Sequence, residues 1–324
     1  MISSVVELCG DEWGAWFPGE PAPALTAAVL TRGRVSDRAT LLLFPVHSPT
    51  ARLAVKLAWS DAAIAALERE SQALRTIERG FPGMPARVPR HLTTAPLPGG
   101  SALVTTALDG RRWRLGENRR LGAPTASRTL ARFGAVADAT ACGRSESRAD
   151  VAVSTLAPVV EWALSMPGLP PSQHAAFIRL AHSLGTCGES FTPRWQHGDL
   201  ATGNILLGRG TLGIVDWEMA SPDLPPWFDL CYVACEATLE LGPRQSVVRW
   251  IVDGVIRPRW QWTLSPSQTL AWTALKAAHR SWGRDDMPHA GWLDVAAELL
   301  RLPEATKRQH RRRKTAGKDL ICDG

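Results

Sequence analysis

The chain has 324 residues, of which 45% are hydrophobic and 21% are charged, a composition typical of a folded globular protein. This length favours one large domain or two lobes that share a cleft. No run of about 18 uncharged apolar residues occurs, and the first residues lack the basic and apolar regions of a signal peptide. We therefore expect neither a transmembrane helix nor a membrane partner.

The net charge of +6 is concentrated near the carboxyl end of the chain. Residues 304–324 contain seven basic and three acidic side chains, which accounts for four of the six net positive charges. A block of like charges repels itself, so residues 306–324 are expected to form a disordered basic tail. The lesser alternative is that this tail contacts nucleic acid or another acidic partner.

The six cysteines have neither the spacing of a disulfide framework nor a C-x-x-C pair. Cys231 and Cys235 lie four residues apart, as two positions on one helix face would. Buried free thiols are therefore expected instead of a metal site. Because free thiols persist in reducing compartments, we expect a cytoplasmic protein.

Short apolar runs separated by turn residues predict an antiparallel sheet in the first hundred residues. One helix is predicted after the third run, because Ser60 or Asp61 can cap its start, apolar residues recur at helical spacing, and Gly80 and Pro82 can end it. The predicted strands are residues 25–31, 40–46, 52–59, 90–95 and 101–108.

From about residue 124 the pattern changes to helices, including residues 171–185 and several beyond residue 227. Short strands are predicted between these helices, at residues 194–197, 204–207 and 212–217. The predicted fold class is α+β, with a five-stranded antiparallel sheet plus one helix followed by a mostly helical lobe. The predicted divisions are residues 1–108, 109–305 and 306–324.

The most informative segment contains His197-Gly198-Asp199 and, five residues further on, Asn204. Asp199 lies on a loop between two predicted strands, and Asp216 ends the next strand. Phosphoryl transfer needs a carboxylate that orients the attacking hydroxyl and oxygen ligands that hold Mg²⁺ on the nucleotide phosphates. The pattern therefore predicts two metal ligands and one free carboxylate on a single loop face. The alternative is that each Asp is a turn residue or helix cap, which would not require this order.

Lys56 lies within an apolar strand, where an unpaired charge is costly. Its partner is expected on the following helix, where Glu68 and Glu70 are the candidates. At 100° per residue, Glu70 lies beside the apolar face of this helix and Glu68 points away from it. We therefore predict a Lys56–Glu70 ion pair; the alternative is that Lys56 lies at a sheet edge and extends into solvent.

The H-G-D-x₄-N segment and the V-D-W-E sequence that follows it resemble the catalytic and metal-binding loops of the aminoglycoside phosphotransferase and choline kinase superfamily. This superfamily has a two-lobed, protein-kinase-like fold. The resemblance implies that Asp199 is the catalytic base and that His197 braces its loop. It also implies that Asn204 and Asp216 are Mg²⁺ ligands and that Asp229 has a structural role.

The same resemblance implies a nucleotide site, for ATP or GTP, between the two lobes. Lys56 would bind the phosphates with Glu70 as its partner, and residues 105–108 would form a hinge. Within this hinge, Thr105 and Ala107 are expected to offer backbone groups to the base. The turn at residues 32–38 has one glycine instead of a glycine-rich loop, and Ser36 is the candidate phosphate contact there. No P-loop motif is present.

Position 201 is Ala, where protein kinases carry a lysine, and this favours a kinase of small molecules. We predict transfer of the γ-phosphate to a hydroxyl of an aminoglycoside, another antibiotic, a sugar or an amino alcohol. The alternatives are a kinase of a peptide Ser or Thr in a biosynthetic pathway and a nucleotide-binding pseudokinase.

The many tryptophans could contact a sugar or a cation, although core positions are the alternative. Acidic residues that could attract a cationic acceptor, unless they lie on solvated faces, are Glu218, Asp223, Glu236, Asp285 and Asp286.

Overall fold

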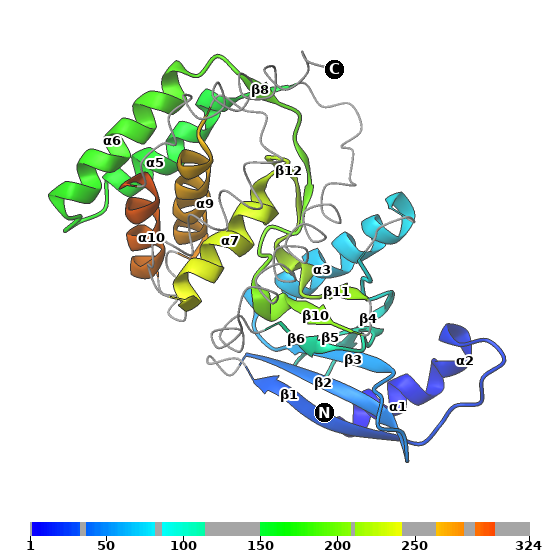
Figure 1. Ribbon diagram of the computed structural model, residues 1–324. Coiled ribbons are helices and arrows are strands. Elements are labelled where there is room, and N and C mark those ends of the chain that lie inside the picture. Colours follow the sequence, from blue (N-terminus) through cyan, green and yellow to red (C-terminus); the bar gives the residue numbers. More distant parts are fainter. Residues whose placement is uncertain are drawn as a thin grey trace, which may run out of the picture.

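The computed structural model describes residues 2–32, 37–81, 86–113, 150–208, 211–241, 264–281 and 289–301. The described residues form an α+β fold with an N-terminal sheet and a mostly helical C-terminal lobe, as the sequence predicts (Figure 1). Ser36, the first helical segment expected after about residue 124 and the basic tail lie outside the described residues. The division at residue 108 stays a prediction.

The N-terminal sheet has five strands in the order β1-β2-β3-β5-β4, and every neighbouring pair is antiparallel. Side chains alternate across the central strand β3, so Leu53, Val55 and Leu57 enter one core while Lys56 lies on the opposite face. The strands are β1 (Leu25–Arg32), β2 (Arg38–Pro45), β3 (Leu53–Ala58), β4 (His91–Leu97) and β5 (Gly100–Thr106).

Helix α3 (Asp61–Gly80) covers the sheet face that carries Lys56. Its N-cap is Ser60, whose side-chain oxygen accepts a hydrogen bond from the Ala63 amide at 3.2 Å. The predicted helix is therefore confirmed. Its buried stripe includes Leu67 and Leu74, and Glu70 lies on the same stripe.

The sequence did not predict the two helices before the sheet, α1 (Ile2–Asp11) and α2 (Trp13–Trp16). Val5, Cys9 and Trp13 are buried in the same core as the inner residues of β2 and β3. The segment contains Ser, Val, Cys and Gly, which are weak helix formers, so burial against the sheet decides its structure.

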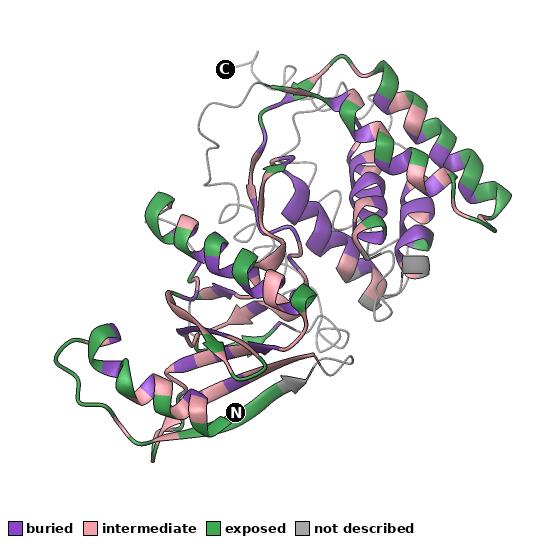
Figure 2. Cartoon of the chain, turned by 180° about the vertical axis from the view of Figure 1, so that it is seen from behind, coloured by how far each residue is buried: buried purple, intermediate pink, exposed green. Residues whose placement is uncertain are grey.

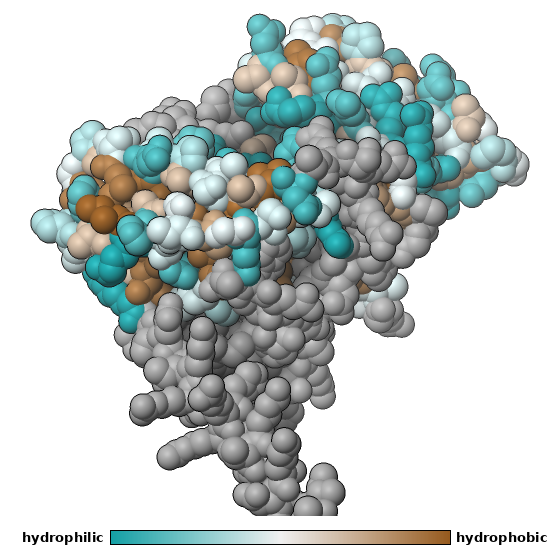
Figure 3. Space-filling view, turned by 90° about the horizontal axis from the view of Figure 1, so that it is seen from above, coloured by the Kyte–Doolittle hydropathy of each residue, from teal (hydrophilic) through white to brown (hydrophobic). Residues whose placement is uncertain are grey.

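The C-terminal lobe is built from α5 (Ala157–Leu164), α6 (Pro171–Thr186), α7 (Phe228–Leu241), α9 (Pro266–Ser281) and α10 (His289–Arg301). Buried residues gather in α7 and in the facing sides of α9 and α10, whereas strand β1 of the other lobe is largely exposed (Figure 2). The buried Cys231 and Cys235 are free thiols, as predicted. On the face drawn in Figure 3, hydrophilic residues are interspersed among hydrophobic ones in the described part.

Short strands and single helical turns complete the C-terminal lobe, and those within residues 194–224 carry the catalytic and metal-binding candidates singled out in the sequence. The strand β10 (Ile205–Leu207) pairs with β11 (Leu212–Ile214) and with β6 (Arg111–Arg112). The other pairs are β9 (Arg194–Gln196) with β12 (Ser221–Leu224) and β7 (Val151–Ala152) with β8 (Ser190–Phe191). The turns are η2 (Val153–Leu156), η3 (Thr202–Asn204) and η4 (Trp217–Met219). Within the described ranges, no helix is both long and apolar enough to cross a membrane.

Candidate active site

The loop that follows β9 begins with His197, Gly198 and Asp199. Gly198 has a φ of 81°, a backbone conformation that favours glycine. A Cβ atom at this position would also collide with the backbone oxygen of Met219. The glycine of the H-G-D sequence is therefore required for the close approach between this loop and the turn η4.

Helix α7 holds this loop through the side chain of Asp229, which is fully buried. Its two carboxylate oxygens accept hydrogen bonds from the amides of His197 at 2.6 Å and Gly198 at 2.8 Å. Burial raises the pKa of Asp229 to about 7, and the two amide bonds act in the opposite direction. Almost two helical turns further along α7, Glu236 accepts a hydrogen bond from the Thr202 amide. The loop therefore takes its position from α7 at both ends.

His197 joins the loop to the segment that follows β11. Its Nδ1 accepts a hydrogen bond from the Asp199 amide at 3.2 Å, so Nε2 carries the proton and donates to the Val215 carbonyl at 2.9 Å. Burial lowers the pKa of His197 to about 4, which keeps the ring neutral at physiological pH. Its ring packs against Trp217, with centroids 4.7 Å apart. This geometry agrees with a bracing role.

Asp199 lies between α7 and the Asp216 segment. Burial raises the pKa of its carboxyl group to about 6, while a hydrogen bond from the Tyr232 hydroxyl lowers it and the nearby Asp216 raises it. The Asn204 side-chain nitrogen donates to the Asp199 backbone carbonyl at 2.9 Å. Sequence reasoning did not identify Tyr232, although it is the single tyrosine of the chain and lies three residues after Asp229.

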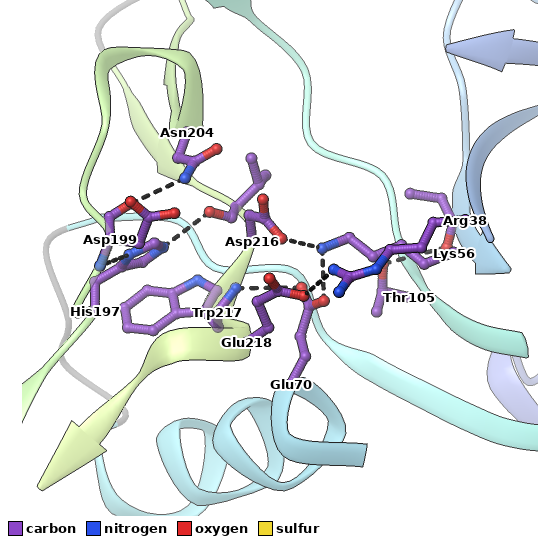
Figure 4. A network of polar contacts seen from close by, with 12 residues as sticks. Arg38, Lys56, Glu70, Thr105, His197, Asp199, Asn204, Asp216, Trp217 and Glu218 are labelled. Atoms are coloured by element: carbon purple, nitrogen blue, oxygen red, sulfur yellow. Dashed lines mark hydrogen bonds and ion pairs between the residues drawn. The ribbon is translucent and has the colours of Figure 1, made fainter. Parts of the chain in front are cut away.

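Lys56 connects the two lobes (Figure 4). Its Nζ lies 2.5 Å from Glu70 Oε2, which confirms the predicted ion pair, and 2.6 Å from Asp216 Oδ1. The side chains are 25% exposed for Lys56, 3% for Glu70 and 40% for Asp216.

The charges of these three residues depend on one another. Burial would lower the pKa of Lys56, but the two carboxylates outweigh it and raise that pKa above its ordinary value. Burial would likewise raise the pKa of Asp216, and the Lys56 ammonium holds it below the ordinary value. For Glu70, burial prevails and raises the pKa.

The residues that follow Asp216 also reach the N-terminal lobe. The Trp217 amide donates to Glu70 Oε1 at 3.3 Å, and Glu218 Oε2 pairs with Arg38 Nη1 at 2.8 Å. The pairing of Arg38 was not predicted, because its partner lies 180 residues away in the sequence.

The predicted hinge, residues 105–108, overlaps the last two residues of β5. The Thr105 side chain is nearly buried, and its hydroxyl donates to the Ala54 carbonyl at 3.3 Å. The Thr106 amide donates to the Arg90 carbonyl at 3.0 Å, and the Ala107 amide donates to the Arg52 carbonyl at 2.9 Å. Because the Ala107 amide already has a protein partner, the group that Ala107 can offer a nucleotide base in this conformation is its carbonyl.

Asn204 and Asp216 have the donor chemistry that Mg²⁺ prefers. The Asn204 nitrogen is held by the Asp199 carbonyl, which leaves the side-chain oxygen for another partner. Asp216 forms its ion pair with Lys56 through Oδ1, and its side chain is 40% exposed. No cluster of three or more His, Cys, Asp or Glu residues suited to a metal occurs among the described residues. Mg²⁺ on a nucleotide needs fewer protein ligands, because phosphates and water complete its shell, so the residues fit this ion.

The residues considered for an acceptor pocket are mostly engaged elsewhere or outside the described ranges. Trp217, Trp227, Trp272 and Trp292 are buried in the core, as the alternative interpretation expects. Glu218 and Glu236 have the partners given above. Asp285 and Asp286 lie outside the described residues.

Comparison with solved structures gives the fold independently. The structure of the GDP and kanamycin complex of APH(2")-IIia has a TM-score of 0.55 and 15% identity, with 90% of this chain and 96% of that chain covered. Aminoglycoside phosphotransferase APH(4)-Ia has a TM-score of 0.60 and 12% identity, with 93% and 98% covered. A thermostable mutant of that enzyme, solved with ADP and hygromycin B, has a TM-score of 0.59 and 13% identity, with 92% and 97% covered.

At such identities these structures show a shared fold, and they are aminoglycoside phosphotransferases. A comparison with curated proteins gives no match. The family comparison covers most of the chain: residues 11–264 match the family described as "Phosphotransferase enzyme family". On this match, which spans both lobes and the whole of the site described above, the chain belongs to that phosphotransferase family.

Proposed function

We propose that the protein transfers the γ-phosphate of ATP or GTP, with Mg²⁺, to a hydroxyl group of a small molecule such as an aminoglycoside, another antibiotic, a sugar or an amino alcohol. The observation that carries this proposal is the convergence of Asp199, Asn204 and Asp216 with the Lys56–Glu70 pair in one hydrogen-bonded network. Phosphoryl transfer is mainly a matter of positioning and of charge, and this network supplies both.

Asp199 is proposed as the base that orients the attacking hydroxyl and accepts its proton. Its loop is fixed by Asp229 and His197, so the carboxylate is positioned before the acceptor arrives. A pKa of about 6 leaves most of the carboxyl ionised at neutral pH and makes it a better proton acceptor than an ordinary aspartate.

The nucleotide is proposed to lie between the lobes. Lys56 would hold the phosphates, with Glu70 keeping the ammonium group in place. Asn204 and Asp216 would hold Mg²⁺, which neutralises charge on the phosphates when it is bound. Thr105 and Ala107 are proposed to contact the base through the backbone, and Ser36 stays a sequence-based candidate for a phosphate contact.

The proposed acceptor carries hydroxyl groups and, in part of this class, positive charge. Solved relatives were crystallised with kanamycin or hygromycin B. The free thiols of Cys9, Cys231 and Cys235 support the proposal that the reaction takes place in the cytoplasm.

The test is a screen of aminoglycosides, other antibiotics, sugars, amino alcohols and short peptides with ATP or GTP, followed by kinetics of Asp199→Asn. We expect kcat to fall by about 10²–10⁴-fold, the usual effect of losing a positioned base, with nucleotide and acceptor affinities kept. Glu68→Gln is the matched control, because Glu68 is an exposed carboxylate on α3.

Three results would overturn the proposal in different ways. A folded Asp199→Asn variant with nearly unchanged kcat would remove Asp199 from the reaction. Phosphorylation of peptides alone would favour the peptide kinase. Nucleotide binding without turnover on any acceptor would favour the pseudokinase.

A further inference from the structure

Three consecutive residues of the C-terminal lobe each bond to a residue of the N-terminal lobe. The Asp216 carboxylate contacts Lys56 at 2.6 Å, and the Trp217 amide contacts Glu70 at 3.3 Å. The third link is the ion pair between Glu218 and Arg38 at 2.8 Å. Figure 4 shows these three links close together, with Asp216 and Trp217 next to the Lys56–Glu70 pair and Glu218 next to Arg38.

Asp216 needs such support because its backbone is unusual. It has a φ of 72° and a ψ of 60°, in the left-handed region that residues other than glycine seldom occupy. Such a conformation persists where the surroundings over-determine it. On one side, the Val215 amide donates to the Asn204 carbonyl at 3.0 Å. On the other side, the Trp217 indole donates to the Ile214 carbonyl at 3.0 Å.

The Arg38–Glu218 pair is built at the far end of this segment. Arg38 is the first residue of β2, and the residue before it is anchored twice: the Asp37 carbonyl accepts from the Trp59 amide at 2.9 Å, and its carboxylate accepts from the Ser60 hydroxyl at 2.7 Å. The Glu218 side chain is 16% exposed and that of Arg38 is 39% exposed. The ion pair therefore joins a fixed strand end to a partly buried carboxylate.

The pair is also separate from the contacts that nucleotide binding must change. On the proposed function, Lys56 turns to the phosphates and Asp216 turns to Mg²⁺, so their mutual contact at 2.6 Å would be given up or weakened. The Arg38–Glu218 ion pair joins two other side chains, although Arg38 lies close enough to Asp216 to act to lower its pKa. The ion pair between Arg38 and Glu218 can keep residues 216–218 against the N-terminal sheet while Asp216 exchanges Lys56 for Mg²⁺.

We propose that Arg38 and Glu218 are positioning residues whose ion pair fixes residues 216–218 against the N-terminal sheet, so that the Asp216 carboxylate faces the nucleotide phosphates. This proposal rests on the proposed function, because it takes Asp216 as a Mg²⁺ ligand. Arg38 and Glu218 then support the binding of the nucleotide with Mg²⁺ and do not contact the acceptor.

The test uses the full chain with Arg38→Gln, Glu218→Gln, the double Gln variant, and the charge-exchanged pair Arg38→Glu with Glu218→Arg. Calorimetry measures ATP affinity with Mg²⁺ and with a chelator, and kinetics give the acceptor KM. We expect each single variant to weaken Mg·ATP binding by about tenfold, corresponding to the loss of one partly buried ion pair. ATP affinity with the chelator and the acceptor KM should stay unchanged.

Two further comparisons separate the ion pair from its members. The double Gln variant should be no weaker than either single variant, because both lose the same interaction. The charge-exchanged variant should recover Mg·ATP affinity to within about threefold of wild type. Glu20→Gln is the matched control, because Glu20 forms a more exposed ion pair with Arg52 outside the site, at 2.9 Å.

Unchanged Mg·ATP affinity in both single variants would overturn the proposal. So would a charge-exchanged variant as weak as Arg38→Gln, or an equal loss of affinity with the chelator, since either result would make Arg38 a phosphate contact in its own right. If the wild type bound no ATP or GTP, the proposed function would fail. The melting temperatures of the same four variants would then decide whether the pair couples the lobes, because additive single losses would show no coupling.

Discussion

Replacing Lys56 with methionine removes the cation that Glu70 and Asp216 share while keeping most of the length of the side chain. Asp216 is 40% exposed and can be solvated, but Glu70 is only 3% exposed. Glu70 keeps the Trp217 amide at 3.3 Å as a donor, which is a weak replacement for an ammonium group at 2.5 Å. The cost of the substitution therefore falls mainly on Glu70.

Two estimates bound the free energy of unfolding that the Lys56→Met variant loses. Breaking a fully buried ion pair by removing one partner costs about 3–5 kcal/mol, and the partial exposure of Lys56 and Asp216 reduces that figure. Glu70 can also escape by taking up a proton. From an ordinary pKa of about 4.3, protonation at pH 7 costs about 3.7 kcal/mol, which sets the upper limit for its share. We therefore expect a loss of about 2–4 kcal/mol at pH 7.

The pH dependence of this loss identifies its cause. Without Lys56, the pKa of Glu70 in the folded state rises further above its value in the unfolded state. The folded state then binds the proton more tightly, so the variant gains stability relative to wild type as the pH falls. At pH 5 the limit set by protonation is only about 1 kcal/mol. Denaturant unfolding of wild type and Lys56→Met at pH 7 and pH 5 measures the difference.

The matched variant is Lys56→Met combined with Glu70→Gln, which removes both charges. It should recover at least half of the stability lost at pH 7, and it should show little change in its deficit between the two pH values. A deficit of equal size at pH 5 and pH 7, or a double variant no more stable than Lys56→Met, would refute the electrostatic reasoning and would point to lost packing instead.

Three further outcomes are expected. Because Asp199 must be ionised to act as a base and burial raises its pKa to about 6, kcat should rise with pH through about 6; a profile that is flat from about pH 5 to 8 would contradict this. Asp216→Asn should raise the Mg²⁺ concentration needed for half-maximal rate, and an unchanged Mg²⁺ titration curve would remove Asp216 from the metal site. Deleting residues 306–324 should leave turnover of a small acceptor intact, because this basic segment has no large apolar side chain before Leu320; a large loss would favour a role in docking a peptide.

The sheet and helix α3 could be predicted because their signals are local. Turn residues bound each strand, and the cap at Ser60 fixes the start of the helix. The angular position of the apolar residues on this helix then decided between Glu68 and Glu70. Helices α1 and α2 could not be predicted in the same way, because Val5 and Trp13 are buried against a sheet whose strands lie further along the sequence.

In the candidate site, too, local features could be predicted from the sequence and distant contacts could not. The order of Asp199, Asn204 and Asp216 is visible because short loops carry all three. The partners that hold them lie far away in the sequence: Asp216 and Lys56 are 160 residues apart, and Glu218 and Arg38 are 180 residues apart. The residue pattern within a single helix or strand does not predict such distant contacts. An arginine at the start of a strand has the same sequence pattern as one exposed to solvent.

The proposed base and the proposed metal ligand are held by different parts of the molecule. Asp199 takes its place from α7, through Asp229, whereas the Asp216 segment is held by the N-terminal lobe, through Lys56 and Glu70. Movement of one lobe relative to the other would therefore change the distance between base and metal unless something joined them.

Two side chains make that join. His197 bonds to the Asp199 amide through one ring nitrogen and to the Val215 carbonyl through the other. Asn204 bonds to the Asp199 carbonyl with its side chain and to the Val215 amide with its backbone carbonyl. Both bridges end at Val215, the residue before Asp216, so the Asp199 loop and the Asp216 segment are joined at two points. This arrangement explains why a neutral, fully buried histidine suits position 197: with one nitrogen accepting and the other donating, it can bond to an amide and a carbonyl at once.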